Sequence, residues 1–193
     1  MQNIGLFFGS FNPVHVGHLI IANYMGEHTD LDQVWLVVTP QNPLKKKRTL
    51  ANNYDRLHLV NLAIEDNPRL QASSIEFGLP QPSYTIDTLT YLKEKHPDDR
   101  FTLIMGGDNL LSLPRWKNYE IILRDYRIFV YSRPDYKLGP LAEHEHVQIF
   151  SDVPQMSISA SFIRKSLQNE KSVRYMLPDS VHDYLMKTNL YRD

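Results

Sequence analysis

Short, continuous runs of apolar residues bounded by turn residues are the feature that most constrains the fold of this chain. Because hydrophobic residues follow one another instead of alternating with polar ones, each run predicts a strand buried on both faces, as in a parallel sheet covered by helices. Six strands are predicted in this way, of which the third and the last have the weaker patterns. They lie at residues 4–8, 34–38, 70–75, 101–105, 127–131 and 147–150.

Segments with helical periodicity lie between and after these runs. Their apolar stripes are formed by Leu57, Val60 and Ile64, by Ile86, Leu89 and Leu92, and by Leu177, Val181, Tyr184 and Leu185. Strands that alternate with helices predict an α/β chain with a Rossmann-like three-layer fold, a mostly parallel central sheet and helices on both faces. Ligands of such folds bind beyond the carboxyl ends of the strands, so the segments after each run are the candidate site.

The composition fits one globular domain. A chain of 193 residues with 42% hydrophobic residues is long enough to bury one substantial core. We therefore expect a single domain over residues 1–193, with a small C-terminal helical part from about residue 157. The chain has no cysteine, which excludes disulfides and thiolate sites and is compatible with a cytoplasmic location.

Charge and hydropathy argue against nucleic-acid and membrane partners. The 21 Lys and Arg residues nearly balance the 22 Asp and Glu residues, so no overall field recruits a polyanion. The apolar run that ends at Phe8 follows no basic segment, and no stretch approaches the roughly 18 apolar residues of a membrane span. We expect small-molecule ligands at a local site, and both a monomer and a homo-oligomer are left open.

The first candidate site follows the first predicted strand. Residues 9–18 read Gly-Ser-Phe-Asn-Pro-Val-His-Val-Gly-His and lead into an apolar helix. Small residues let a phosphate approach the backbone, and a helix that begins near residue 16 offers unpaired N–H groups to an anion. His15 and His18 can face the same ligand. The alternatives are a plain turn, capping or packing histidines, and a metal pair, for which no further ligand is evident.

A second candidate site lies near the other end of the chain. Residues 156–164 read Met-Ser-Ile-Ser-Ala-Ser-Phe-Ile-Arg, and a helix N-cap is predicted at Ser157 or Ser159, as one is at Asn52 or Asn53. Serine hydroxyls, free N–H groups and a nearby arginine suit an anion. Taken alone, the segment is also compatible with an ordinary capped helix.

Together, these two segments resemble the two signatures of the nucleotidylyltransferase superfamily. The first signature reads Gly-Gly/Ser-Thr/Ser-Phe-Asp-Pro-x-His-x-Gly-His, from which this chain departs at Asn12, and the second reads Ile-Ser-Ser/Ala-Thr/Ser-x-Ile-Arg. The resemblance implies that His15, His18 and Arg164 are catalytic and stabilise a displacement at the α-phosphorus of ATP. The ATP-binding residues that it implies on these segments are Gly9, Ser10, Phe11, His15, His18, Ser159, Ser161 and Arg164.

Three further segments resemble the nicotinate-nucleotide adenylyltransferase family of this superfamily. They are Pro-Ser-Tyr-Thr at 82–85, a Gly-x-Asp turn within 104–109 and a Trp-containing segment at 113–119. The resemblance implies that Thr85 meets the pyridine carboxylate and that the Trp116 indole stacks on the pyridine ring. An aromatic face with amide donors suits a flat anion. The remaining implied ATP contacts are Gly106, Asp108 and Arg133, and the implied mononucleotide contacts are Ser10, Asn12, Lys45, Lys46, Tyr84, Thr85 and Trp116.

The basic run 45–48 follows the second predicted strand and resembles a family loop of the type Pro-x-x-x-Pro-His-Lys, with Leu44 in place of the histidine. Its other reading is a solvated loop. No nucleophile with an adjacent base is evident, so the predicted chemistry is direct transfer, in which the protein aligns an ionised mononucleotide phosphate with the α-phosphorus. Mg²⁺ is expected with ATP, without dedicated protein ligands.

The expected function is therefore adenylyl transfer from ATP to nicotinate mononucleotide, a step of NAD biosynthesis. Three alternatives remain. One is a related adenylyltransferase acting on nicotinamide mononucleotide or on another phosphorylated acceptor such as pantetheine phosphate. The second is a nucleotide-binding module without turnover, and the third is a metal-dependent hydrolase built on the histidine pair.

Overall fold

The structure is a computed structural model that describes residues 1–40, 50–132 and 138–192. Its six strands are β1 (Asn3–Gly9), β2 (Gln33–Val38), β3 (Leu70–Ser73), β4 (Arg100–Gly106), β5 (Arg127–Tyr131) and β6 (Val147–Phe150). Its α-helices are α1 (Val16–His28), α2 (Asn53–Ile64), α3 (Thr85–Lys95), α4 (Gly107–Ser112), α5 (Tyr119–Asp125), α6 (Ala160–Gln168) and α7 (Asp179–Lys187). Short 3₁₀ helices lie at Ile75–Gly78, Leu113–Arg115, Pro140–Glu143 and Arg174–Met176.

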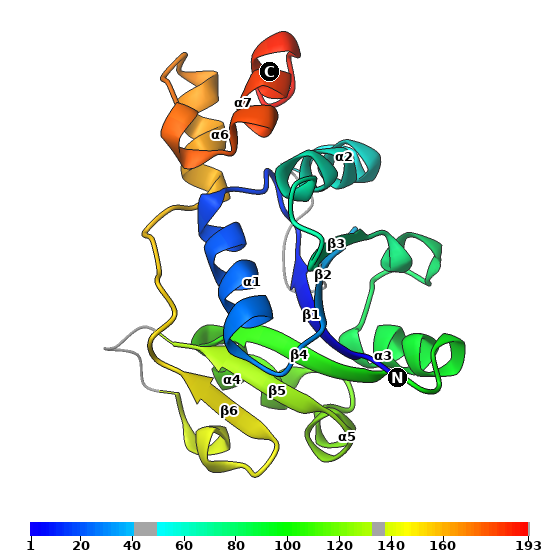
Figure 1. Cartoon of the computed structure of the whole chain (residues 1–193). Coiled ribbons are helices and arrows are strands. Elements are labelled where there is room, and N and C mark those ends of the chain that lie inside the picture. The colour runs from blue at the N-terminus through cyan, green and yellow to red at the C-terminus, as the bar shows by residue number, and fades with distance from the viewer. Residues whose placement is uncertain (41–49, 133–137, 193) are drawn as a thin grey trace.

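The six strands form one sheet in the order β3-β2-β1-β4-β5-β6 (Figure 1). Every pairing between neighbouring strands is parallel, so the predicted α/β fold is confirmed and the described sheet is wholly parallel. From β1 the chain adds strands toward β3, and it then crosses to β4 on the other side. The carboxyl ends of β1 and β4 therefore flank the point where the strand order reverses, which is where open α/β sheets bind ligands.

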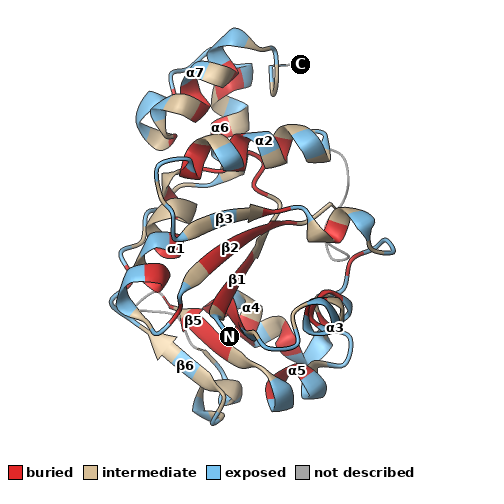
Figure 2. Cartoon of the chain, turned by 45° about the vertical axis from the view of Figure 1, so that its right-hand side comes forward, coloured by how far each residue is buried: buried red, intermediate tan, exposed pale blue. Residues whose placement is uncertain are grey.

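The helices cover both faces of the sheet through two hydrophobic clusters. One cluster joins the sheet to α1, α2 and the C-terminal helices α6 and α7, and the other joins it to α3, α4 and α5. Successive side chains of β1 enter opposite clusters, since Phe7 belongs to the first and Leu6 to the second. This two-sided burial, visible in Figure 2, explains why the strands read as continuous apolar runs.

The C-terminal helices pack on α2. The hydroxyl of Ser180 donates to the Leu62 carbonyl at 2.8 Å, and the rings of His58 and Tyr184 lie 4.7 Å apart. Figure 1 shows α6 and α7 stacked beyond α2 at one end of the sheet. A helical C-terminal part thus follows residue 157, while the expectation of a single domain stays a prediction.

Several local expectations are met, and two boundaries differ. Asn52 and Ser159 are the N-caps of α2 and α6, with side chains that accept from the backbone N–H groups of Tyr54 and Phe162. The run predicted as a strand at 70–75 ends at Ser73, and a 3₁₀ turn follows. Similarly, α7 begins after the buried Leu177 rather than including it. Among the described residues, no helix is both long and apolar enough to cross a membrane.

Candidate active site

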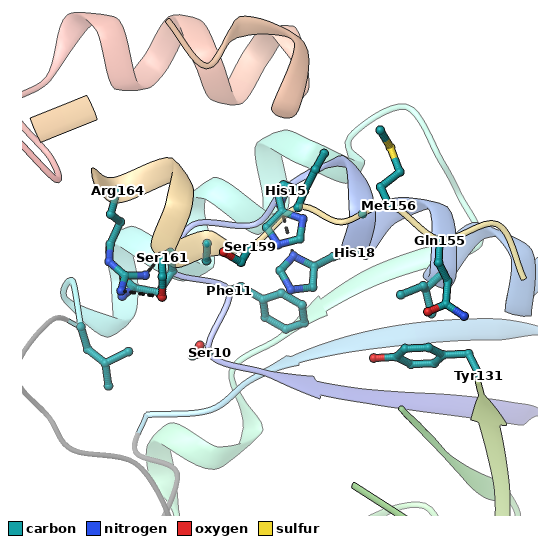
Figure 3. A pocket seen from close by; sticks show the side chains of 16 residues that line it. Ser10, Phe11, His15, His18, Tyr131, Gln155, Met156, Ser159, Ser161 and Arg164 are labelled. Carbon is teal, nitrogen blue, oxygen red and sulfur yellow. Dashed lines mark hydrogen bonds between the residues drawn. The ribbon is translucent and has the colours of Figure 1, made fainter. Parts of the chain in front are cut away.

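A cavity of about 500 Å³ opens at the carboxyl end of the sheet, beside the turn that follows β1 (Figure 3). Both signature segments line it. The first contributes Ser10, Asn12, His15 and His18, and the second contributes residues 158–161 together with Arg164. The cavity therefore unites two segments that lie about 150 residues apart in sequence.

The turn after β1 has an unusual backbone that a glycine and an aromatic ring make possible. Phe11 has a φ of 43°, in the left-handed region that bulky residues rarely adopt, yet its side chain is 1% exposed. A Cβ atom on Gly9 would lie only 2.8 Å from the Phe11 ring. Gly9 itself does not line the cavity, so the structure places it in packing beneath the turn rather than against a ligand.

His15 and His18 lie at the beginning of α1. His15 is the N-cap, and its backbone N–H donates to Nδ1 of His18 at 3.3 Å. Because Nδ1 accepts this bond, a neutral His18 carries its proton on Nε2 and can donate with that atom. A glycine fits at position 17 between them for a steric reason, since a Cβ atom there would lie 3.1 Å from Nδ1 of His15.

Burial keeps His15 neutral. The residue is 6% exposed, and its Nδ1 has no hydrogen-bond partner among the described residues. Burial lowers the pKa of His15 to about 4, because the charged imidazolium loses its hydration. At neutral pH this ring is therefore a neutral group facing the cavity and not a standing cation.

Arg164 connects the two signatures directly. Its Nη1 donates to the backbone carbonyl of Asn12 at 2.7 Å, and its Nη2 donates to the Ser161 hydroxyl at 3.3 Å. The N-terminus of α6 and the N-terminus of α1 consequently face one cavity. Unpaired N–H groups at helix N-termini attract anions.

The charges of the cavity favour an anionic ligand. Among the described residues that line it, Arg164 is the only Lys or Arg, and there is no Asp or Glu. Nor do the described parts of the chain contain a group of three or more His, Asp or Glu side chains that could hold a metal ion. Within those parts of the chain, the histidine pair thus lacks a third protein ligand.

The predicted mononucleotide residues Tyr84, Thr85 and Trp116 lie outside the cavity lining. Lys117 lies with its ammonium 4.9 Å from the Tyr84 ring and pairs with Asp87 at 2.9 Å, so the Trp-containing segment lies against the beginning of α3 at Thr85. Trp116 is half-buried and packs against the second hydrophobic cluster, and its buried Nε1 has no partner among the described residues. Two of the three family-like segments are therefore side by side.

Gly106 and Asp108 adjoin the cavity through Tyr131. Gly106 ends β4 and pairs in register with Tyr131, which lines the cavity, and a Cβ atom on Gly106 would lie 2.6 Å from Oδ1 of Asp108. Asp108 is exposed and is not the N-cap of α4, since that position is Gly106. Neither residue lines the cavity itself. Lys45, Lys46 and Arg133 lie outside the described residues.

Four lining residues lie outside the two predicted segments, namely Ile21, Leu50, Tyr131 and Gln155. Tyr131 ends β5, and an aromatic residue at the carboxyl end of a predicted strand was a usable signal. Gln155 precedes the second predicted segment and carries no comparable signal. The Gln155 amide donates to the Ser132 carbonyl at 2.7 Å, which orients it beside the Tyr131 ring (Figure 3).

Comparison with known proteins agrees with this geometry. A family model described as cytidylyltransferase-like matches residues 6–166. A protein of Flavobacterium psychrophilum named "Probable nicotinate-nucleotide adenylyltransferase" is 53% identical over 193 residues, covering 99% of this chain and 100% of its own. A protein of the same name from Cytophaga hutchinsonii is 51% identical and covers 98% of each chain. The chain belongs to the nicotinate-nucleotide adenylyltransferase family. It is thus a nucleotidyltransferase, as the two signatures predicted.

Solved structures confirm the fold of the family. The nicotinic acid mononucleotide adenylyltransferase of Plasmodium falciparum, complexed with NaAD, superposes with a TM-score of 0.83 at 21% identity, covering 99% of this chain and 98% of that one. The same enzyme complexed with APC gives a TM-score of 0.82 at the same identity and coverage. At this identity the likeness is one of fold, and it spans the whole chain.

Proposed function

We propose that this chain transfers the AMP part of ATP to nicotinate mononucleotide, giving nicotinate adenine dinucleotide and pyrophosphate. The observation that carries the proposal is the single cavity in which His15, His18 and Arg164 converge without a carboxylate among its described lining residues. Such a set of donors suits the phosphates of ATP and the charge that moves onto pyrophosphate during the reaction.

The reaction requires no covalent intermediate. A phosphate oxygen of the mononucleotide attacks the α-phosphorus of ATP, and the bond between the α-phosphorus and the bridging oxygen to the β-phosphorus breaks. The bonding electrons leave with pyrophosphate. The attacking phosphate is already ionised, so the protein contributes alignment and charge stabilisation rather than a general base.

Each proposed catalytic residue has a role that follows from its contacts. Nε2 of His18 carries the proton that donates to a phosphate oxygen, because Nδ1 is engaged by the His15 backbone. Arg164 provides the fixed positive charge, anchored on the Asn12 carbonyl beside the turn. Neutral His15, stacked on His18, gives a second imidazole at the same place without adding a charge before ATP arrives.

The acceptor is proposed to bind toward the beginning of α3. Thr85 is the first residue of this helix, so unpaired N–H groups there can meet the pyridine carboxylate. The Trp116 segment lies alongside, held by the contact between Lys117 and Tyr84. Nicotinamide carries no charge at the corresponding position, and a site of backbone donors therefore favours the acid over the amide.

Mg²⁺ is proposed to enter with ATP. The described part of the chain offers no cluster of acidic or imidazole ligands for a metal, which fits an ion held mainly by phosphate oxygens and water. When bound, the ion neutralises part of the triphosphate charge. The described residues of the cavity then hold the remaining phosphate oxygens through Arg164 and the histidines.

ATP labelled with ³²P at either the α or the γ position tests the reaction type. Adenylyl transfer predicts that the α label appears in the dinucleotide and that the γ label appears in pyrophosphate. A γ label in the acceptor would show phosphoryl transfer, and release of γ-labelled inorganic phosphate alone would show hydrolysis. Either result would overturn the proposal.

A further inference from the structure

Among the described residues, Arg56 is the most deeply buried charged side chain, and it has no part in the mechanism described so far. It lies in the first turns of α2 and is 0% exposed. In the described residues it forms no ion pair with a carboxylate, and its partners are instead neutral oxygens. A buried arginine without an acidic partner is costly, so its position calls for an explanation.

The guanidinium joins three segments beside the cavity. Its Nη1 donates to the backbone carbonyls of Ser10 and Thr39, the latter at 2.9 Å, and its Nε donates to the carbonyl of Ala51 at 3.1 Å. Its Nη2 donates to Oδ1 of Asn53 at 2.7 Å. One side chain thus ties the turn after β1 to the segment after β2 and to the approach to α2.

The bond to Ser10 determines which way the next amide points. In a trans peptide the C=O and the following N–H point in opposite directions, and the bond between Ser10 and Phe11 is trans. The Ser10 carbonyl faces Arg56, which does not line the cavity, whereas Ser10 and Phe11 do. The Phe11 N–H is consequently directed away from Arg56 and toward the cavity side.

The backbone at Phe11 supports the same conclusion. Its left-handed φ of 43° is a conformation that persists only where the surroundings impose it, and such turns arrange N–H groups into anion-binding concavities. The buried positive charge of Arg56 lies directly behind this turn. Asn12 forms a second connection between this turn and the segment before α2, since its Oδ1 accepts a hydrogen bond from the Ala51 N–H at 3.1 Å.

We propose that Arg56 is a positioning residue for adenylyl transfer: by holding the Ser10 and Thr39 carbonyls, it presents the Phe11 amide to a phosphate of the substrate. Its buried charge adds to the attraction of that turn for an anion. This inference rests on the proposed function. It assigns Arg56 no direct contact with substrate, because Arg56 does not line the cavity.

Arg56→Lys tests the proposal, because lysine keeps the charge but cannot bond three carbonyls in a fixed plane. We expect the affinity for inorganic pyrophosphate to fall about tenfold and kcat about a hundredfold, the loss expected for a misplaced binding group. In ¹H–¹⁵N spectra, pyrophosphate should shift the Phe11 amide of the wild-type protein and leave it unshifted in the variant. If Arg56 only stabilised the fold, the substitution would not selectively abolish the pyrophosphate-induced shift of the Phe11 amide.

Arg69→Met is the matched control. Arg69 also donates to a backbone carbonyl, that of Gly26. It precedes β3 and therefore lies at the amino end of that strand, whereas the cavity lies at the carboxyl end of the sheet. We expect it to lower Tm while leaving pyrophosphate affinity and kcat within about twofold of wild type, as for a site that does not couple to the cavity. If Arg69→Met loses as much activity as Arg56→Lys, or if Arg56→Lys keeps wild-type affinity and turnover, the proposal is wrong.

Asn53→Ala covers the case in which Arg56→Lys does not fold. It removes one acceptor of the guanidinium at the surface end of α2, and we expect a loss of pyrophosphate affinity of about threefold with the fold intact. An unchanged affinity and an unchanged Phe11 amide shift would contradict the proposal. Pyrophosphate can bind without a mononucleotide, so these titrations test Arg56 even if nicotinate mononucleotide proves not to be the substrate. If pyrophosphate does not shift the Phe11 amide signal of the wild-type protein, that result alone overturns the inference.

Discussion

The imidazole rings of His15 and His18 are stacked, with centroids 3.7 Å apart and planes inclined by 27°. This pairing explains why a glycine stands at position 17, directly before His18, since a larger residue there would crowd the His15 ring. It also assigns the rings different roles. Nδ1 of His18 is engaged by the backbone, while His15 stays neutral because of its burial.

His18→Ala should abolish most of the turnover with little effect on folding. The ring is proposed to donate through Nε2 to a phosphate whose charge changes in the transition state, and loss of such a donor reduces kcat by roughly 10²–10³-fold. Steady-state kinetics with ATP and nicotinate mononucleotide measures this. His58→Ala, which alters an exposed histidine that packs on Tyr184, serves as the control and should retain wild-type kcat. A His18→Ala protein with near-normal turnover would remove this residue from the mechanism.

Stability should depend on His15 between about pH 4 and 6.5. The unfolded chain protonates this imidazole near its ordinary pKa of about 6.5, whereas the folded chain resists protonation until about pH 4. The unfolded state therefore binds more protons in this range, so the contribution of His15 to stability is fully present above pH 6.5 and is lost as the pH falls toward 4. The loss amounts to roughly 2–3 kcal/mol.

Urea unfolding of the wild type and of His15→Asn at pH 7.5 and pH 4.5 checks this linkage. Both proteins lose stability on acidification because of their carboxylates. The wild type should lose roughly 2–3 kcal/mol more than the variant. Equal losses would mean that His15 titrates with its ordinary pKa and is accessible to water in the folded protein.

Arg164 should tolerate no substitution, including lysine. The guanidinium bonds the Asn12 carbonyl and the Ser161 hydroxyl and is proposed to meet phosphate as well. Arg164→Ala should lower kcat/KM about a hundredfold, and Arg164→Lys about tenfold, because lysine lacks the planar set of donors. Lys165→Ala changes the exposed neighbour and should have little effect. Full activity of Arg164→Lys would show that only the charge matters.

Trp116 should act on the acceptor more than on ATP. Trp116→Ala removes the proposed stacking face and should raise the KM for nicotinate mononucleotide roughly three- to tenfold more than the KM for ATP. Trp116→Phe keeps an aromatic ring and should recover part of the loss. Equal changes in both KM values would contradict the stacking role and leave Trp116 as a packing residue of the second hydrophobic cluster.

The fold was largely predictable because its strands are buried on both faces. All six predicted strands are present, and most of their ends lie within one residue of the predicted ones. The exception is the run at 70–75. Here the apolar pattern continues past the end of β3 into a 3₁₀ turn, in which Ile75 packs against the second cluster and the Glu76 side chain is buried. Hydrophobic periodicity alone does not separate a strand from such a turn.

The site was predictable where a local backbone feature carries the function. Both signatures combine a turn or cap with a helix N-terminus, and the parallel sheet brings them to one edge. Arg56 could not be foreseen, because in the sequence it resembles any arginine on an amphipathic helix. Its burial depends on the carbonyls of Ser10 and Thr39, which only the tertiary structure places around it.

The most direct test of the central claim is pyrophosphate release by the purified chain with ATP, Mg²⁺ and either nicotinate or nicotinamide mononucleotide over a range of concentrations. We predict that pyrophosphate is released and that kcat/KM is at least roughly tenfold higher for nicotinate mononucleotide than for nicotinamide mononucleotide. The reason is that the carboxylate of the acid can meet the N-terminus of α3. Equal use of the two acceptors would contradict the proposed roles of Thr85 and Trp116. No release with either would contradict the proposed function itself.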